Sequence, residues 1–193
     1  MSQTEEKIVP TRDECLRLMD RYKMLKNIVN HSLTVTKVAL FLSRELNKKG
    51  QEIDLAVVEA ASLLHDLAKT ECLKTKEDHA RQGFRVLKKL GYGRTAEVVA
   101  QHIEVSNEGD SPAVSEEEVV NYTDKRVRHD RIVSLKERFS DLKDRYGRVK
   151  SALDQMDRME KATYAIEYKI FSVLGSDPKD LQRLQNESLD EFD

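Results

Sequence analysis

The sequence predicts an all-α fold, and three observations support that prediction. Apolar residues recur with the three-and-four spacing of amphipathic helices along most of the 193 residues. Only 7 Gly and 3 Pro are present, which is too few for a loop-rich all-β fold. Charged residues make up 35% of the chain, as suits helices with solvated outer faces. No convincing strand pattern is present, and the length allows one hydrophobic core with a helical extension.

Two of the expected helices begin at capping boxes, in which a Ser or Thr precedes a Glu by three residues. Thr11 and Glu14 form the first box, and Ser115 and Glu118 form the second. The segment 54–69 is apolar on most sides, which indicates a central, buried helix. The predicted helices cover residues 11–22, 30–47, 54–69, 77–90 and 94–105, with a sixth that begins after the second capping box.

A heptad pattern of apolar residues predicts a long C-terminal helical extension. Gly147 lies within the pattern and weakens a helix by about 1 kcal/mol without necessarily ending it. The extension can pack on the core, pair with another chain, or form a helical hairpin with residues 162–174. We favour intramolecular packing that also contributes to a homodimer. The heptad positions are Leu135, Phe139, Leu142, Tyr146, Val149, Leu153 and Met156.

Composition and charge argue against several classes of protein. The net charge is −2 and the pI is near 6.3, so there is no strong signal for nucleic-acid binding. Cys15 and Cys72 are the only cysteines and do not form a CxxC pair, so we expect a reducing, cytoplasmic location. The polar N-terminus does not resemble a signal peptide. The apolar stretch 55–64 is interrupted by Glu59 and is too short to span a membrane.

The adjacent pair His65-Asp66 is the main candidate for chemistry. It follows the most apolar segment of the chain, where an unpaired carboxylate is expensive to bury. A divalent metal would give both side chains a partner, since imidazole and carboxylate are common metal ligands. The alternative is structural, with the aspartate capping a turn and the histidine bonded to a backbone carbonyl. The pair alone does not decide between these interpretations.

Four further residues strengthen the metal interpretation. His31, His79, His102 and Asp124 each lie near the apolar face of a separate predicted helix. A single histidine in such a position usually has a structural role in the core. Four histidines and two aspartates, distributed one or two per helix, are better explained by a shared metal centre.

The order of these residues resembles the HD-domain superfamily of metal-dependent phosphohydrolases, over about residues 25–130. HDLAK at 65–69 looks like the HDIGK form of many members, and TDK at 123–125 is similar to the family's closing Asp-Lys element. The resemblance implies an HD-type helical bundle of the HDIG-like subgroup. It also implies a first metal site made by His31, His65, Asp66 and Asp124, and a second ion held by His79 and His102.

The resemblance further implies an activity. Asp66 would bridge two divalent ions, and Lys69 matches a lysine near the substrate phosphate, so both are expected to be catalytic. Two such ions, about 3.5–4 Å apart, activate a water for in-line attack on phosphorus, so no nucleophilic side chain is required. The expected substrate is a phosphorylated small molecule, either a phosphomonoester or a phosphodiester, with a nucleotide favoured. The ligand types do not distinguish Fe, Mn, Co, Ni and Zn.

The basic run after the last proposed ligand adds candidates for substrate binding. Lys125 follows that ligand directly, and Arg128 would lie one helical turn after it on the same face, where a guanidinium can bind phosphate in bidentate fashion. We therefore expect Lys69, Lys125 and Arg128 to bind substrate. The alternative for this run is a solvated helix end, which we favour for Arg126. His129 is expected either at the surface or in contact with substrate.

Two other functions stay open. Some HD-domain proteins use the same six ligands for a di-iron centre and oxidise small phosphonates or polyols. A non-catalytic sensor that binds nucleotide and signals through the C-terminal helix is the other alternative, although the complete ligand set argues against it. A subgroup that hydrolyses cyclic dinucleotides carries a second HH and a GYP signature, and this sequence has neither.

We expect three regions along the chain. Residues 1–130 form the phosphohydrolase domain. Residues 131–175 form the helical extension, packed on that domain or on a partner chain. Residues 176–193 form a polar, acidic tail.

Overall fold

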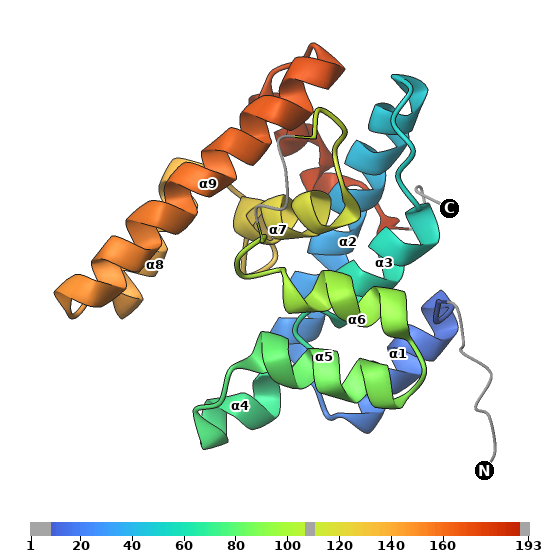
Figure 1. The fold of residues 1–193 in the computed structure, drawn as a ribbon, viewed down its shortest axis with the longest axis vertical. Coiled ribbons are helices and arrows are strands. Elements are labelled where there is room, and N and C mark those ends of the chain that lie inside the picture. The colour runs from blue at the N-terminus through green and yellow to red at the C-terminus, as the bar shows by residue number, and fades with distance from the viewer. Residues whose placement is uncertain (1–8, 107–110, 190–193) are drawn as a thin grey trace.

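The computed structural model describes residues 9–106 and 111–189, and nearly all of its regular structure is helical (Figure 1). The all-α prediction is therefore confirmed. In the described part of the chain, no helix is long and apolar enough to cross a membrane. The elements are α1 (Arg12–Arg21), α2 (Lys26–Lys48), α3 (Leu55–Leu64), α4 (Lys69–Thr75), α5 (His79–Lys89), α6 (Gly93–Ala100), α7 (Glu116–Arg126), β1 (Val127–Arg128), β2 (Arg131–Ile132), α8 (Leu135–Tyr146), α9 (Lys150–Leu174) and a 3₁₀ helix, η1 (Pro178–Asn186).

The helix starts follow the capping signals. The Thr11 and Ser115 boxes form as expected, with each hydroxyl accepting a hydrogen bond from the backbone of the glutamate three residues on. Helices α3 and α5 begin after Asp54 and Asp78, whose carboxylates accept two backbone N–H bonds each. Helix α2 begins at Lys26 rather than at residue 30, so the first proposed ligand lies in its second turn.

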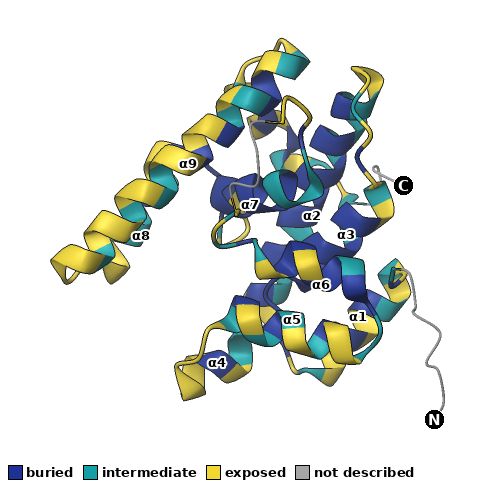
Figure 2. Ribbon diagram, in the orientation of Figure 1, coloured by how far each residue is buried: buried dark blue, intermediate teal, exposed yellow. Residues whose placement is uncertain are grey.

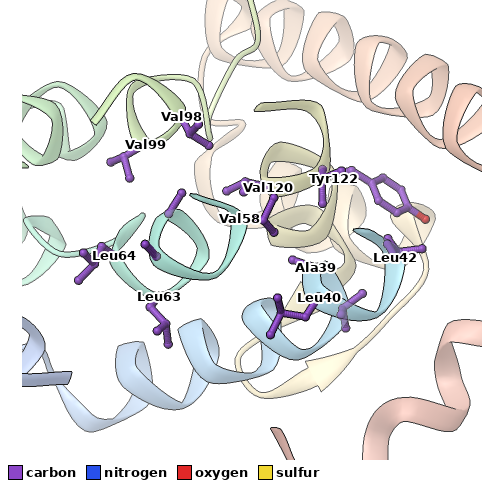
Figure 3. Close-up of a cluster of buried hydrophobic side chains, with 14 of the residues drawn as sticks. Ala39, Leu40, Leu42, Val58, Leu63, Leu64, Val98, Val99, Val120 and Tyr122 are labelled. Carbon is purple, nitrogen blue, oxygen red and sulfur yellow. The ribbon is translucent and has the colours of Figure 1, made fainter. Parts of the chain in front are cut away.

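The hydrophobic core lies where α2, α3 and α7 pack together (Figure 3). Leu42 from α2, Leu63 and Leu64 from α3, and Val120 from α7 are all fully buried. Each fully buried side chain of this size contributes about 1.5–3 kcal/mol to folding. Tyr122 is also fully buried, and its hydroxyl donates to Glu167 of α9 at 2.7 Å. The core thus holds α2, α3 and α7 at fixed positions around the candidate site.

The single helix predicted for residues 54–69 is wrong. Helix α3 ends at Leu64, and a tight turn leads into α4 at Lys69. Within the turn the backbone N–H groups of Leu67 and Lys69 bond to carbonyls three residues back, in place of the four-residue spacing of an α-helix. Neighbouring residues in an α-helix do not face one another, so this turn allows His65 and Asp66 to approach the same centre.

A short hairpin follows α7, where no strand was predicted. Helix α7 ends at Arg126, and β1 pairs antiparallel with β2 through Val127 opposite Ile132. His129 occupies the turn with a positive φ of 60°. The expectation that Arg128 lies on the helical face of Asp124 is therefore wrong.

The C-terminal extension is a helical hairpin rather than one continuous heptad helix (Figure 2). Helix α8 ends at Tyr146 with Gly147 as its C-cap, where a Cβ would lie 2.5 Å from the carbonyl oxygen of Lys143, so the turn between α8 and α9 favours glycine. Leu135 and Phe139 are buried, whereas Val149 is 60% exposed. The heptad residues thus do not form one seam, and self-association of the extension stays a prediction.

The segment expected to be a polar tail packs on the body as far as it is described. Leu181 and Leu184 of η1 are each 1% exposed. Lys37 of α2 donates to the backbone carbonyls of Gln185 and Glu187 at 3.3 and 2.7 Å. Two apolar residues three apart in an otherwise polar sequence, together with these hydrogen bonds, hold this short helix on the body.

We predict that Leu184→Ala lowers the free energy of unfolding by about 2–5 kcal/mol, because it removes a fully buried side chain and leaves a cavity. Gln182→Ala on the exposed face of η1 is the matched control and should change stability by less than about 0.5 kcal/mol. Urea denaturation followed by circular dichroism measures both. Equal stability of the two variants would show that η1 does not contribute to the core.

Candidate metal centre

A pocket of about 380 Å³ gathers the chemistry-bearing side chains that the sequence singled out. Its walls come from α2, the turn between α3 and α4, α4, α5, the segment after α6, α7, the turn between β1 and β2, and the α8–α9 hairpin. His65 is fully buried beneath this pocket. The pocket is lined by five of the six predicted ligands, namely His31, Asp66, His79, His102 and Asp124.

Three of the four histidines are oriented by backbone carbonyls. A carbonyl oxygen only accepts, so the Nδ1 of each ring carries the proton and its Nε2 keeps a free lone pair when the ring is neutral. This arrangement is typical of histidines that bind metal through Nε2. The Nδ1 to oxygen distances are 2.9 Å from His31 to His129, 2.8 Å from His65 to Ser62, and 2.7 Å from His102 to Val99.

The first cluster of potential ligands consists of His31, His65 and Asp124. The Oδ1 of Asp124 lies 3.0 Å from Nε2 of His31 and 3.6 Å from Nε2 of His65. One ligand atom from each residue falls within 4.8 Å of the others, and all three residues are buried. Two imidazoles and a carboxylate at this spacing suit a divalent ion.

The second cluster consists of Asp66, His79 and His102. The Oδ1 of Asp66 lies 3.2 Å from Nε2 of His79 and 3.8 Å from Nε2 of His102. The two Nε2 atoms are 3.1 Å apart. Burial, and then the nearby His65, hold the pKa of His102 well below its usual range, so this ring presents a lone pair. Two facing imidazole nitrogens need a proton or a cation between them, which makes the cluster a second candidate ion site.

Asp66 connects the two clusters. Its Oδ2 lies 3.5 Å from Nε2 of His65 and accepts a bond from Nζ of Lys69 at 2.7 Å, while its Oδ1 faces the second cluster. Burial opposes ionisation of this carboxylate, but His65 and Lys69 outweigh burial and hold its pKa well below the usual range.

The donor set fits divalent ions. The Nε2 of His65 and the Oδ1 of Asp66 are buried without a hydrogen-bond partner in the part of the chain that the structure describes. Unpartnered buried polar atoms are costly, and a carboxylate that stays ionised is more costly still. An ion in each cluster would give both atoms the partner that they lack.

The predicted substrate-binding residues divide into two groups. Lys69 and Lys125 line the pocket, whereas Arg128 is not among its lining residues. Lys125 is buried, donates to the backbone carbonyl of His102 and lies 3.1 Å from Oδ2 of Asp124. It therefore ties α7 to the segment after α6. His129 is exposed and lines the pocket through the turn of the hairpin.

The sequence prediction missed the contribution of the α8–α9 hairpin. Arg138 and Arg145 of α8 line the pocket, together with Leu142, Tyr146 and Met159. The two arginines are seven residues apart, which places them on one face of a helix two turns apart. That spacing, with Leu142 between them, was the available signal.

We predict that His79→Ala lowers the number of bound ions from two to one per chain, because His79 belongs to the second cluster alone. Asp66→Ala should weaken binding of both ions, since its two oxygens face different clusters. Mass spectrometry of metal content after loading with Mn²⁺ and desalting measures both variants. His129→Asn is the control, because it keeps the backbone carbonyl that orients His31 and tolerates the positive φ. Two ions retained by His79→Ala would contradict the assignment.

Comparison with known proteins identifies relatives of this chain. A tRNA (cytidine(56)-2'-O)-methyltransferase of Picrophilus torridus is 30% identical over 192 residues, covering 92% of this chain and 51% of the relative. The enzyme of the same name from Thermoplasma volcanium is 30% identical over 98 residues, covering 50% and 27%. An uncharacterized protein of Methanocaldococcus jannaschii is 29% identical over 76 residues, covering 39% and 44%.

This chain thus spans about half the length, or less, of the curated relatives that it matches. No solved structure matches it significantly. The family model described as HD domain matches residues 28–159, a range that includes both candidate clusters and continues through α8 into α9. Because that match covers more than half of the 193 residues, the chain belongs to the HD domain family.

Proposed function

We propose that this protein is a metal-dependent phosphohydrolase that cleaves a phosphomonoester or phosphodiester, with a nucleotide as the favoured substrate. The supporting observation is that four imidazole Nε2 atoms and two carboxylates form two adjacent clusters, with five of the six residues lining one pocket. HD domains bind divalent metals, and the family consists mainly of phosphohydrolases. The six convergent residues are the proposed metal ligands: His31, His65, Asp66, His79, His102 and Asp124.

The six proposed ligands form two groups, one for each proposed ion. His31, His65 and Asp124 would hold one ion, His79 and His102 the other, and Asp66 would contact both. Divalent ions bound there supply Lewis acidity and lower the pKa of a water molecule towards neutrality. The carbonyl bonds at Nδ1 keep three of the rings in fixed orientations, so little reorganisation is needed when ions bind.

Lys69 is proposed to act as a fixed cation near the phosphate. Burial opposes its charge, but Asp66 outweighs burial and raises the pKa of Lys69, so the ammonium stays protonated near neutral pH. It is therefore a hydrogen-bond donor and not a general base. From the pocket wall its ammonium can stabilise the charge that develops on phosphoryl oxygens.

The pocket favours attack by water over a covalent mechanism. No Ser, Thr or Cys is present among the described residues that line it. An aliphatic hydroxyl or a thiol is therefore not available there as the nucleophile of a covalent phosphoryl intermediate. The histidines and aspartates are the proposed metal ligands, so we propose water as the nucleophile, with its proton passing to solvent or to the leaving group.

The methyltransferase activity named for two relatives is not proposed for this chain. The chain covers only 51% and 27% of those relatives, so a large part of each lies outside the matched region. The side chains that converge here are metal ligands and cations. They suit a phosphorylated substrate, and the pocket offers no feature that we can connect with methyl transfer.

We predict that the protein loaded with Mn²⁺ or Fe²⁺ hydrolyses at least one member of a panel of nucleotides and simple phosphoesters. Asp66→Ala should lower the rate by about 1,000-fold or more, because loss of metal-based electrostatic stabilisation removes several kcal/mol from the transition state. Release of phosphate measures monoester cleavage, and chromatography measures diester cleavage.

Asp154→Ala, at an exposed position on α9, is the matched control and should retain full activity. Chelation should abolish hydrolysis, and added metal should restore it. Turnover that requires both iron and oxygen would instead support an oxygenase. Methyl transfer to tRNA without phosphoester hydrolysis would overturn the proposal.

A further inference from the structure

Arg138 of α8 is a cation in the pocket wall without a dedicated acidic partner. Its side chain is 12% exposed, and its Nε is buried with no hydrogen-bond partner in the described structure. Its closest carboxylate is Asp141, whose Oδ2 lies 3.4 Å from a terminal guanidinium nitrogen. Charge-assisted bonds between such groups are usually about 2.7–2.9 Å long. The guanidinium therefore has N–H donors that lack an acceptor in the described structure.

Asp141 also forms an ion pair with a second arginine. The same Oδ2 atom makes a closer ion pair with Arg145, one turn further along α8. One carboxylate thus serves two guanidinium groups, which together carry ten N–H donors. An ordinary pair between residues three apart on a helix surface would have its cation in solvent. The buried Nε of Arg138 does not fit that description.

The other charges around the pocket increase the need for an anion. Its lining residues include the cations Lys69, Lys125, Arg138 and Arg145 but only the carboxylates Asp66 and Asp124. The two lysines now pair with those carboxylates, at 2.7 and 3.1 Å. Divalent ions bound by Asp66 and Asp124 would compete with the two lysines for the negative charge of these carboxylates. The loaded pocket would then hold a large excess of positive charge, which only an anionic ligand can balance.

We propose that Arg138 binds the phosphoryl group of the substrate and selects a phosphomonoester dianion over a phosphodiester monoanion. The inference rests on the proposed phosphohydrolase function and names the substrate class for that site. The planar fork of the guanidinium can donate two parallel bonds to phosphoryl oxygens. Leu142 and Tyr146, beside it on α8, form an apolar wall for the organic part of the ester.

Packing of α8 on the core makes this position specific. Leu135 and Phe139 of α8 are 2% and 0% exposed. Arg138 lies between them on the helix, three residues after the first and one before the second. The anchored helix therefore holds the guanidinium at the pocket wall with little conformational freedom to lose on binding.

The test measures binding of inorganic phosphate to the metal-loaded protein by calorimetry, with dimethyl phosphate as the monoanionic diester probe. Arg138→Gln should weaken phosphate binding by roughly 10- to 100-fold, since it removes hydrogen bonds to a charged group. Arg138→Lys keeps the charge but loses the fork, so its affinity should be intermediate. Lys136→Gln makes the same charge change at an exposed position of α8 and should bind phosphate like the unchanged protein.

Two results would overturn the inference. One is phosphate binding by Arg138→Gln that equals that of the Lys136→Gln control at equal metal content. The other is equal affinity of the unchanged protein for phosphate and dimethyl phosphate. If thermal melting shows that Arg138→Gln is unfolded, Arg138→Lys decides the question. Because binding of phosphate needs no turnover, the inference can fail while Asp66→Ala still abolishes hydrolysis, and a protein without hydrolytic activity can still show the Arg138 effect.

Discussion

The buried carboxylate of Asp66 is the constraint around which the candidate site is built. Its residue is 1% exposed, and an ionised carboxylate at such a depth costs several kcal/mol unless charges and donors surround it. Lys69 supplies one partner from the next helical turn, and His65 and His79 lie within 3.5 Å of its oxygens. Helix α5 must therefore lie close to the turn after α3, and α6, which packs on both α3 and α5, holds it there.

Two of the histidines are held by the same structural device. His65 and His102 each lie just after a helix, and each ring bonds to the carbonyl three residues earlier, in the last turn of that helix. The last carbonyls of a helix lack i+4 partners, so each ring gives such a carbonyl a hydrogen bond while its Nε2 is directed to the site. Helix ends of this kind also carry partial negative charge. The Nε2 atoms of these two rings and the partial negative charge of the two helix ends therefore both favour cations at this part of the pocket.

The six proposed ligands stood out in the sequence because their residue types are informative wherever they occur. Histidines and aspartates on apolar faces need partners, and the same six residues that stood out in the sequence form two adjacent clusters, five of them lining one pocket. Their local structure was less predictable. His65 and His102 were placed inside helices, but both follow helix ends that no Gly or Pro marks. At each end the histidine ring bonds to a carbonyl three residues earlier, a local contact that leaves no trace in the apolar periodicity.

For the arginines, unlike the proposed ligands, the sequence did not predict which side chain lines the pocket. Arg128 follows a ligand closely in sequence and yet leaves the helix, because α7 ends at Arg126 and a hairpin replaces its next turn. Arg138 is distant from every ligand in sequence and returns to the pocket because Phe139 anchors α8 on the core. Position along the chain predicts proximity only within one regular element. Across a turn, the packing of apolar neighbours decides which charged side chain reaches the site.

The charged side chains around the pocket lie in two separate groups. Carboxylates and helix ends lie at the floor, where cations are stabilised, and Arg138 and Arg145 lie along the α8 wall. The proposed substrate has an anionic group that the arginines of α8 can bind and an organic part that can contact Leu142 and Tyr146 of the same helix. The α8–α9 hairpin, which contributes no predicted metal ligand, therefore has a physical reason to be part of the site.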